Sequence, residues 1–316
     1  MKNVMKLWTA KLTISTYQIV FITSLCFLIL LNSIGAANAS TYNHASGNIK
    51  ISSVPKKVVV FDLGALDTLD SLNVPIVGVT KTHTGGFLSA YRSKKYKSVG
   101  SLFEPDYESV ASLSPDIIFI GTRTQPTYQM MNSIAPTFDA SIENNDFLLE
   151  FAKATTNIAS IFNKSDIASN ALAEITQKQD AIREMAINSG DLLMVMTSGG
   201  KLTVFGQNSR YGWIFNELNI KSGMDSLGNS PHGEPISMEY LLKINPEHLL
   251  VLDRDAAIGR QVGTAKALLD NETFKKLSAH QNDKVVFLNS FAWYTVGNGL
   301  TAVNQMLDDL ADVFTN

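Results

Sequence analysis

The sequence predicts an α/β protein built from two Rossmann-like lobes joined by a long helix. Short β-branched runs alternate with helical segments over most of the chain, which is typical of parallel sheets covered by helices. One unit of helix, proline turn, strand and arginine occurs twice, and a long stretch without Gly or Pro lies between its copies. At 316 residues the chain is long enough for about two domains.

The repeated unit has the same spacing in both copies. The first runs from Glu108 through Pro115 to Arg123, and the second, 131 residues later, runs from Glu239 to Arg254. Each copy predicts an amphipathic helix, a turn, a buried strand and an arginine just past the strand's carboxyl end, where open α/β sheets bind ligands. We therefore expect two similar lobes, each presenting a cation to whatever lies between them.

The first 39 residues differ in composition from the rest. Their only charges are three Lys, and an apolar run from Ile19 to Leu31 precedes the small residues Ala37-Asn38-Ala39. This pattern predicts a secretory signal peptide over residues 1–39, with an uncleaved anchor as the alternative. Cys26, the chain's one cysteine, lies in the apolar run. Either it carries a lipid after cleavage, or a cut after Ala39 removes it.

The bulk composition excludes some classes of protein. Losing residues 1–39 changes the formal net charge from −3 to −6, because three Lys and no acid are removed. A mildly acidic surface argues against nucleic-acid binding. No other apolar run approaches the ~20 residues that a membrane-spanning helix needs.

After a polar, loose lead-in at 40–55, we expect an N-terminal lobe at 56–145, a connecting helix at 146–188 and a C-terminal lobe at 189–316. Outside the repeated units, strands are expected at 57–61, 76–79, 137–138, 192–196, 202–205 and 285–288, and helices at 65–72, 130–134, 211–218, 274–277 and 300–314. The connecting segment predicts one helix, with or without a break near Asn163. Two packed helices with a turn are the alternative.

Three arginines are candidates for binding an anion. Arg123 and Arg254 follow buried strands, and Arg210 follows a turn that leads into a helix. A guanidinium keeps its proton and offers a planar fork of donors. The alternatives are a salt bridge to a local acid, such as Asp253 or Asp255, and a plain surface position for Arg210.

His232 and Tyr294 are candidates for metal binding. His232 lies in a loop flanked by Pro and Gly, and Trp293-Tyr294 lies between the last strand and the final helix. Imidazole and phenolate both bind Fe³⁺. For Trp293 the alternatives are a pocket wall and core packing. Glu108 and Glu239 occupy matched places, either as solvated helix acids or as two anionic knobs for a partner with two basic sockets.

At these residues the sequence resembles the periplasmic binding proteins of ABC-type iron–siderophore importers. It is most similar to the group of ferric-anguibactin- and CeuE-type proteins that handles catecholate and related siderophores. The motifs that carry the resemblance are Ser-Arg-aromatic-Gly at 209–212, His-Gly-x-Pro at 232–235, Trp-Tyr and Gly-Asn-Gly within 293–299, and the two repeated units. The resemblance implies the class III periplasmic binding protein architecture.

The resemblance also implies a role for each candidate. Arg123, Arg210 and Arg254 would form a basic triad around an anionic ferric siderophore, and His232 and Tyr294 would complete the coordination of Fe³⁺. The three positive guanidiniums would attract a negatively charged ferric siderophore, and Trp293 could face planar catechol rings. Glu108 and Glu239 would dock onto an inner-membrane permease. The family's Gln is replaced by Glu234, which puts the preferred siderophore in doubt.

The expected protein is a monomer of the Gram-negative periplasm, free or anchored to the inner membrane through Cys26. It is expected to have no catalytic residues and no permanent cofactor. Two other readings stay open at this point. The same fold could carry haem, cobalamin or a bare metal ion, or the chain could be an exported esterase with His232 as base and Ser230 or Ser237 as nucleophile.

Overall fold

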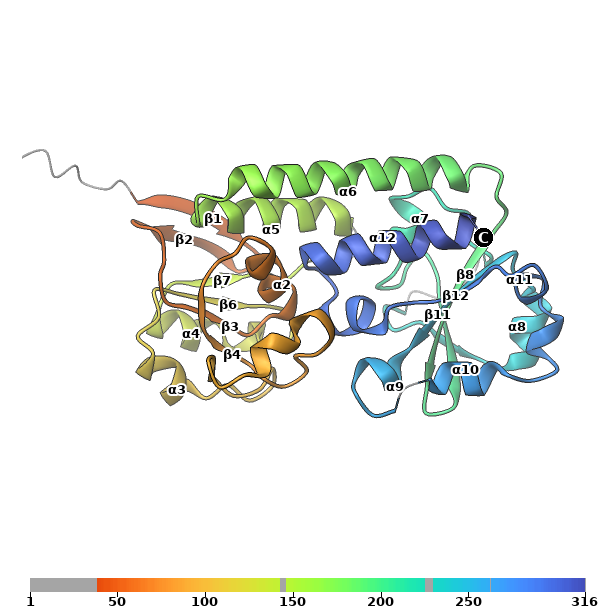
Figure 1. Ribbon diagram of the computed structural model, residues 1–316, viewed down its shortest axis with the longest axis horizontal. Helices are drawn as coiled ribbons and strands as arrows, with labels where there is room; N and C mark the ends of the chain where they lie inside the picture. Colours follow the sequence, from red (N-terminus) through yellow and green to blue (C-terminus); the bar gives the residue numbers. More distant parts are fainter. Residues whose placement is uncertain (1–38, 143–145, 225–229, 262, 316) are drawn as a thin grey trace, which may run out of the picture. The chain divides into compact units, whose positions relative to one another are not determined.

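The computed structural model describes residues 39–142, 146–224, 230–261 and 263–315 (Figure 1). The predicted signal peptide and Cys26 lie outside these residues. No helix in the described ranges is both long and apolar enough to cross a bilayer.

Two five-stranded sheets have the same strand order. The first, ordered β5-β4-β3-β6-β7, contains β3 (Val58–Val60), β4 (Ile76–Val79), β5 (Lys97–Ser98), β6 (Ile117–Ile120) and β7 (Thr137–Asp139), all parallel. The second, ordered β10-β9-β8-β11-β12, contains β8 (Leu192–Ser198), β9 (Lys201–Phe205), β10 (Glu234–Ile236), β11 (His248–Asp253) and β12 (Val285–Phe287). Here β8, β11 and β12 are parallel, whereas β8-β9-β10 is antiparallel. The predicted α/β class with two sheet lobes is confirmed.

The central strands are buried along their whole length because helices cover both of their faces. Every residue of β6 and β11 is buried, as expected for parallel strands of this kind. The helices are α2 (Leu63–Ser71), α3 (Tyr107–Ser112), α4 (Tyr128–Ile134), α5 (Phe147–Ile161), α6 (Ser165–Ala186), α7 (Trp213–Asn216), α8 (Met238–Ile244), α9 (Arg254–Ala257), α10 (Thr264–Leu269), α11 (Ser278–Gln281) and α12 (Leu300–Thr315). Short 3₁₀ turns cover Gly86–Arg92, Gln125–Thr127 and Phe274–Lys276, and Phe291–Val296 is π-helical.

The repeated unit of the sequence is a repeated unit of the structure. Asp106 and Ser237 cap α3 and α8, and each side chain accepts a backbone N–H three residues on. The residue before each proline, Ser114 or Asn245, is left-handed with φ of 48° or 49°. The prolines then lead into β6 and β11. The two halves therefore match in local conformation as well as in spacing.

The single helix expected over 146–188 is divided in two. Helix α5 ends at Ile161 and α6 begins at Ser165, with Asn163 at φ 55° between them. A left-handed residue cannot continue a right-handed helix, so the chain turns here, where the sequence allowed a break. Helix α6 then lies alongside both α5 and α12 (Figure 1).

The expected loose lead-in at 40–55 is wrong, because its first part forms a hairpin. Strands β1 (Ser40–His44) and β2 (Gly47–Ile51) pair in antiparallel fashion around Gly47, whose φ is 135°. Ile49 is buried, and the backbone N–H of Ala45 donates to Asp139 O in β7. The alternation of polar and apolar residues in β2, where Ile49 and Ile51 are separated by Lys50, is a sequence pattern typical of a strand.

The two sheets share one hydrophobic core. A continuous cluster of buried side chains includes Val60 of the first sheet, Leu252 of the second, and Leu310 of α12. Asp67 of α2 ties these parts together, because its carboxylate accepts the N–H of Ala302 at 2.9 Å in the first turn of α12. A Cβ on Gly299 would lie 2.1 Å from the same carboxylate, so glycine is needed for this contact.

Candidate ligand-binding cleft

Arg123 is held at the end of β6 by a compact turn. The hydroxyl of Thr124 accepts the N–H of Gly121 at 3.1 Å, and the N–H of Thr124 donates back to Gly121 O at 2.9 Å. A Cβ on Gly121 would lie 2.0 Å from the Asp62 carboxylate, so only glycine allows β3 and β6 to end this close together. The Arg123 side chain is exposed and makes no ion pair within the described ranges.

Arg254 is the first residue of α9, directly after β11. Its guanidinium donates from Nε to the Tyr294 hydroxyl at 2.7 Å and from Nη1 to Ser198 Oγ at 3.1 Å. The neighbouring acids are engaged elsewhere: Asp253 accepts from three donors around α9 and α10, and Asp255 accepts from Gly199 N. The local salt bridge that the sequence left open is therefore not formed among the described residues.

Two guanidiniums lie close to the ring of Tyr294. The guanidinium carbons of Arg210 and Arg254 lie 4.8 and 5.4 Å from its centroid, within the range of a cation–π contact. Arg210 also donates to the hydroxyl of Tyr211 at 2.6 Å. Burial raises the pKa of Tyr211 to about 12, against the opposing effect of Arg210. This partner is therefore neutral and leaves the charge of Arg210 uncompensated.

His232 is placed by the loop before β10. The N–H of Arg210 donates to Pro231 O at 3.1 Å, which ties this loop to the turn that carries Arg210. Gly233 has φ 73°, and a Cβ there would lie 2.5 Å from Val204 O. Glycine is therefore required for the backbone to turn directly after His232, whose side chain is exposed.

These residues surround two cavities that share two wall residues. The His232 cavity, about 410 Å³, is lined by Asp62, Arg123, Arg210, Tyr211, Trp213, His232, Trp293 and Tyr294, among others. The Arg254 cavity, about 360 Å³, is lined by His83, Leu102, Phe103, Arg123, Arg254, Ile258, Arg260, Tyr294 and Thr295. Arg123 and Tyr294 belong to both walls, and we call the two cavities together the arginine cleft.

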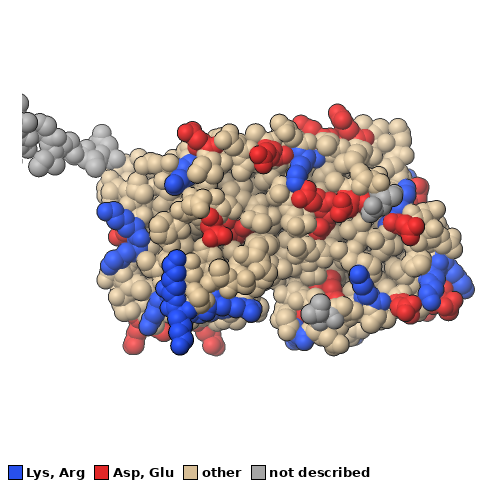
Figure 2. All heavy atoms as spheres, viewed as in Figure 1, with Lys and Arg blue, Asp and Glu red and all other residues tan. Residues whose placement is uncertain are grey.

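The surface is hollowed between the two lobes, and α9, which begins at Arg254, borders this hollow (Figure 2). The structure brings together the predicted residues Arg123, Arg210, Arg254, His232 and Tyr294, contributed by both lobes. Within the described part of the chain, no three His, Cys, Asp or Glu side chains are grouped to hold a metal ion. His232 and Tyr294 could thus only add to donors that a ligand supplies.

Trp293 lines the His232 cavity, but its contacts favour the core-packing alternative. Its side chain is 2% exposed, its ring stacks on Trp213 at 5.8 Å, and its indole N–H donates to Asp309 at 2.8 Å. The predicted contact with a ligand through Trp293 is therefore limited to the edge that reaches the wall.

Glu108 and Glu239 lie outside the cleft. Both are exposed, and each is the second residue of its helix, two positions after the capping residue. Neither lines either cavity. Their matched placement is preserved in three dimensions, as two carboxylates at equivalent positions of the two lobes.

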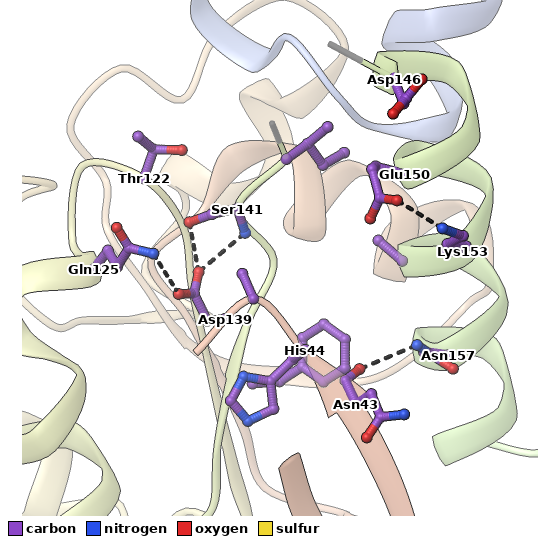
Figure 3. Close-up of a pocket in the computed structure, with 14 residues that line it drawn as sticks. Asn43, His44, Thr122, Gln125, Asp139, Ser141, Asp146, Glu150, Lys153 and Asn157 are labelled. Carbon is purple, nitrogen blue, oxygen red and sulfur yellow. Dashed lines mark hydrogen bonds and ion pairs between the residues drawn. The ribbon is translucent and has the colours of Figure 1, made fainter. Parts of the chain in front are cut away.

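A larger cavity, about 600 Å³, lies under the N-terminal hairpin (Figure 3). Its central acid, Asp139, accepts hydrogen bonds from Ser46, Gln125 and Ser141, and on its far wall Lys153 pairs with Glu150 at 2.7 Å. These polar groups satisfy one another and hold the hairpin on the sheet. No arginine is among the described residues that line this cavity, which distinguishes it from the arginine cleft.

Sequence reasoning missed Asp62, His83, Phe103 and Arg260 in the wall of the cleft. A signal was available for two of them, because Asp62 follows the first strand directly and His83 lies in the loop after the second. Burial raises the pKa of Asp62 to about 6, whereas a hydrogen bond from Ala65 N and the charge of Arg123 lower it. The cleft therefore contains a titratable acid among its guanidiniums.

A scan against protein-family models matches residues 58–291 to the family described as periplasmic binding protein. The chain belongs to this family.

Relatives of this periplasmic binding protein include siderophore-binding proteins. The petrobactin-binding protein YclQ of Bacillus subtilis is 36% identical, and the alignment covers 83% of this chain and 84% of YclQ. The crystal structure of YclQ has a TM-score of 0.82, and the match covers 88% of this chain and 99% of the YclQ chain. The ferric-anguibactin-binding protein FatB of Vibrio anguillarum is 32% identical over 84% and 85%. The catecholate-siderophore-binding protein VctP of Vibrio cholerae is 31% identical with a TM-score of 0.82 over 87% and 100%. The predicted resemblance is confirmed.

The proximity of Arg123 and Asp62 can be checked without a ligand. We expect Asp62 to titrate near pH 6 in carboxyl ¹³C NMR, with Asp62→Asn identifying the signal. Asparagine preserves the helix cap. Arg123→Ala should raise this pKa further, because it removes the cation that stabilises the carboxylate. The exposed Lys243→Ala change is the control. An Asp62 that titrates near its ordinary value and ignores Arg123 would contradict this geometry.

Proposed function

We propose that this chain is the substrate-binding component of an ABC importer, binding an anionic ferric siderophore and delivering it to an inner-membrane permease. The observation that carries the proposal is the arginine cleft, where Arg123, Arg210 and Arg254 have no carboxylate partner within salt-bridge distance in the described ranges. Siderophore-binding relatives over most of the chain support the same conclusion.

The chemistry of the cleft fits a ferric catecholate or mixed catechol ligand. Such a chelate spreads negative charge over several oxygen atoms. Fixed guanidiniums in a partly water-excluded cleft attract it and donate charge-assisted hydrogen bonds. The edge of Trp293 and the exposed ring of Phe103 offer aromatic contact to planar rings. The similarity to a catecholate-siderophore-binding protein supports this class of ligand.

Iron enters as part of the cargo. His232 and Tyr294 line the same cavity, one from the loop before β10 and the other from the π-helical segment. We propose that an imidazole nitrogen and the phenol oxygen complete the coordination of Fe³⁺ when the siderophore supplies fewer than six donors. The hydrogen bond from Arg254 Nε fixes the position of that phenol oxygen.

The protein is proposed to be non-catalytic. Of the two candidate nucleophiles for an esterase, Ser237 is the N-cap of α8, where its hydroxyl accepts the N–H of Tyr240 at 3.1 Å. We propose that it acts as a monomer in the periplasm, either free or anchored through Cys26. Haem and cobalamin are tested as competing cargoes below, since none of the relatives named above is described as binding either.

Tryptophan fluorescence gives a direct test of binding. Apart from Trp8, the tryptophans are Trp213 and Trp293, which both line the His232 cavity. We expect quenching on titration with ferric petrobactin, ferric anguibactin or the ferric complex of 2,3-dihydroxybenzoate, and none with haem or cobalamin. Arg210→Ala and Arg254→Ala should each weaken binding by about 10–100-fold, the range for a charged hydrogen bond.

The control for these variants is Lys243→Ala, which removes one positive charge from the exposed face of α8. It should bind as the wild type does. Equal affinity for ferric and iron-free ligand, or binding of the corrinoid or haem alone, would refute the proposed cargo.

Direct coordination of iron can be tested by absorption spectroscopy. The ligand-to-metal band of the ferric complex should shift when wild-type protein is added, because His232 and Tyr294 replace solvent on the metal. With His232→Ala and Tyr294→Phe we expect the shift to shrink or vanish, while Arg210→Ala lowers affinity and leaves the shifted band in place at saturation. A full shift in both donor variants would exclude coordination by these residues.

Permease docking can be separated from binding by reversing two charges. We propose that Glu108 of the first lobe and Glu239 of the second lobe each pair with a basic residue of the permease. Glu108→Lys and Glu239→Lys should leave siderophore affinity unchanged and reduce uptake into cells, most strongly in the double variant. Asp312→Lys, on the exposed side of α12, is the control. Normal uptake with the double variant would rule out this docking mode.

A further inference from the structure

His83 has three features that packing alone does not explain. It lies in the loop after β4, its φ is 68°, and its Nδ1 is covered without a hydrogen-bond partner among the described residues. A non-glycine residue in the left-handed region and a buried unpaired nitrogen each have a cost in stability. Such features concentrate where a ligand contacts the protein.

The loop that carries His83 is well held. Thr84 Oγ1 donates to Lys81 O at 2.9 Å, and Arg92 Nε donates to Thr84 O. Gly86 packs against the ring of Phe291 in the other lobe, where a Cβ would lie 2.7 Å from that ring. The backbone conformation at His83 is therefore fixed by the neighbouring loop contacts.

His83 lines the Arg254 cavity, with Arg123, Arg254 and Tyr294 in the same wall. Phe103, whose side chain is 68% exposed, lines this cavity too. His232 and Arg210 line only the other cavity. The two histidines therefore stand in different halves of the arginine cleft, His83 from the first lobe and His232 from the second.

We propose that His83 is a further ligand-binding residue, which donates a hydrogen bond from its imidazole to an anionic oxygen of the siderophore in the Arg254 cavity. This inference rests on the proposed function and extends it. No hydrogen bond from the described residues holds Nδ1, so the ring can turn toward a ligand at no loss of such a bond. A ligand there also meets Arg254 and the ring of Phe103.

The proposal assigns different tasks to the two halves of the cleft. The His232 cavity holds the metal, and the Arg254 cavity recognises the organic part that extends beyond it. Because imidazole has a single N–H when neutral, His83 adds directional selection that the arginines alone lack. The proposal thus makes His83 a determinant of which siderophore is bound.

The test uses His83→Asn and His83→Gly in the fluorescence titration with ferric petrobactin, ferric anguibactin and ferric 2,3-dihydroxybenzoate. Asparagine and glycine both accept a positive φ, so both variants should fold and melt at or above the wild-type temperature. We expect each to bind the tightest of the three ligands about tenfold more weakly. The ligand-to-metal band should keep its wild-type position at saturation.

His280→Asn is the matched control, since His280 is exposed and lines neither half of the cleft. Unchanged affinity in both His83 variants, or an equal loss in the control, would overturn the assignment. A displaced band would also overturn it, because His83 would then be an iron ligand. If the wild type binds none of the three ligands, the proposed function fails instead, and that result is distinct from the others.

Discussion

Uncompensated positive charge between two sheets is the constraint on which the rest of this structure depends. Arg123, Arg210 and Arg254 converge on one cleft, and within the described ranges none forms an ion pair. Like charges held together in a partly dehydrated space repel one another. An anion bound in the cleft would reduce this repulsion. Because the net charge of the chain is negative, the excess of positive charge is local to the cleft and is not a property of the whole surface.

The scaffold supplies what such a cleft needs, which is fixed geometry. Two equivalent units end their strands at Arg123 and Arg254, and contacts that only glycine permits close the backbone at Gly121, beside Arg123, and at Gly233, beside His232. Tyr294, which packs against the hydrophobic cluster, is positioned by a hydrogen bond and two cation–π contacts. Because one hydrophobic cluster includes residues of both sheets and of α12, the lobes are coupled through packed side chains. Large relative movement would disrupt this packing.

The spacing of the sequence predicted most of the fold and the places of Arg123 and Arg254 at strand ends, whereas the family resemblance implied that Arg210, His232 and Tyr294 join them in one site. Strand periodicity and the 131-residue repeat determine which side chains follow the strand ends, and parallel strands bring those ends together. The break at Asn163 and the φ of His83 depend on individual backbone conformations that composition does not specify. The π-helical turn at Phe291–Val296 could not be predicted from composition either. The burial of Trp293 in this turn depends on packing against Trp213, which lies in a distant segment of the chain.

Asp62 adds to the positively charged cleft a carboxyl group whose charge depends on pH. Its carboxylate stands near Arg123, and Asp139 lies close enough to disfavour its ionised form. Its pKa is raised to about 6, so it carries most of a negative charge at neutral pH and progressively loses it below that value. An anionic chelate in the His232 cavity would raise the pKa further, since like charges disfavour ionisation. By linkage, proton uptake on binding means tighter binding at lower pH. One acid in a cationic cleft would thus moderate the affinity for an anion near neutrality and strengthen it at lower pH.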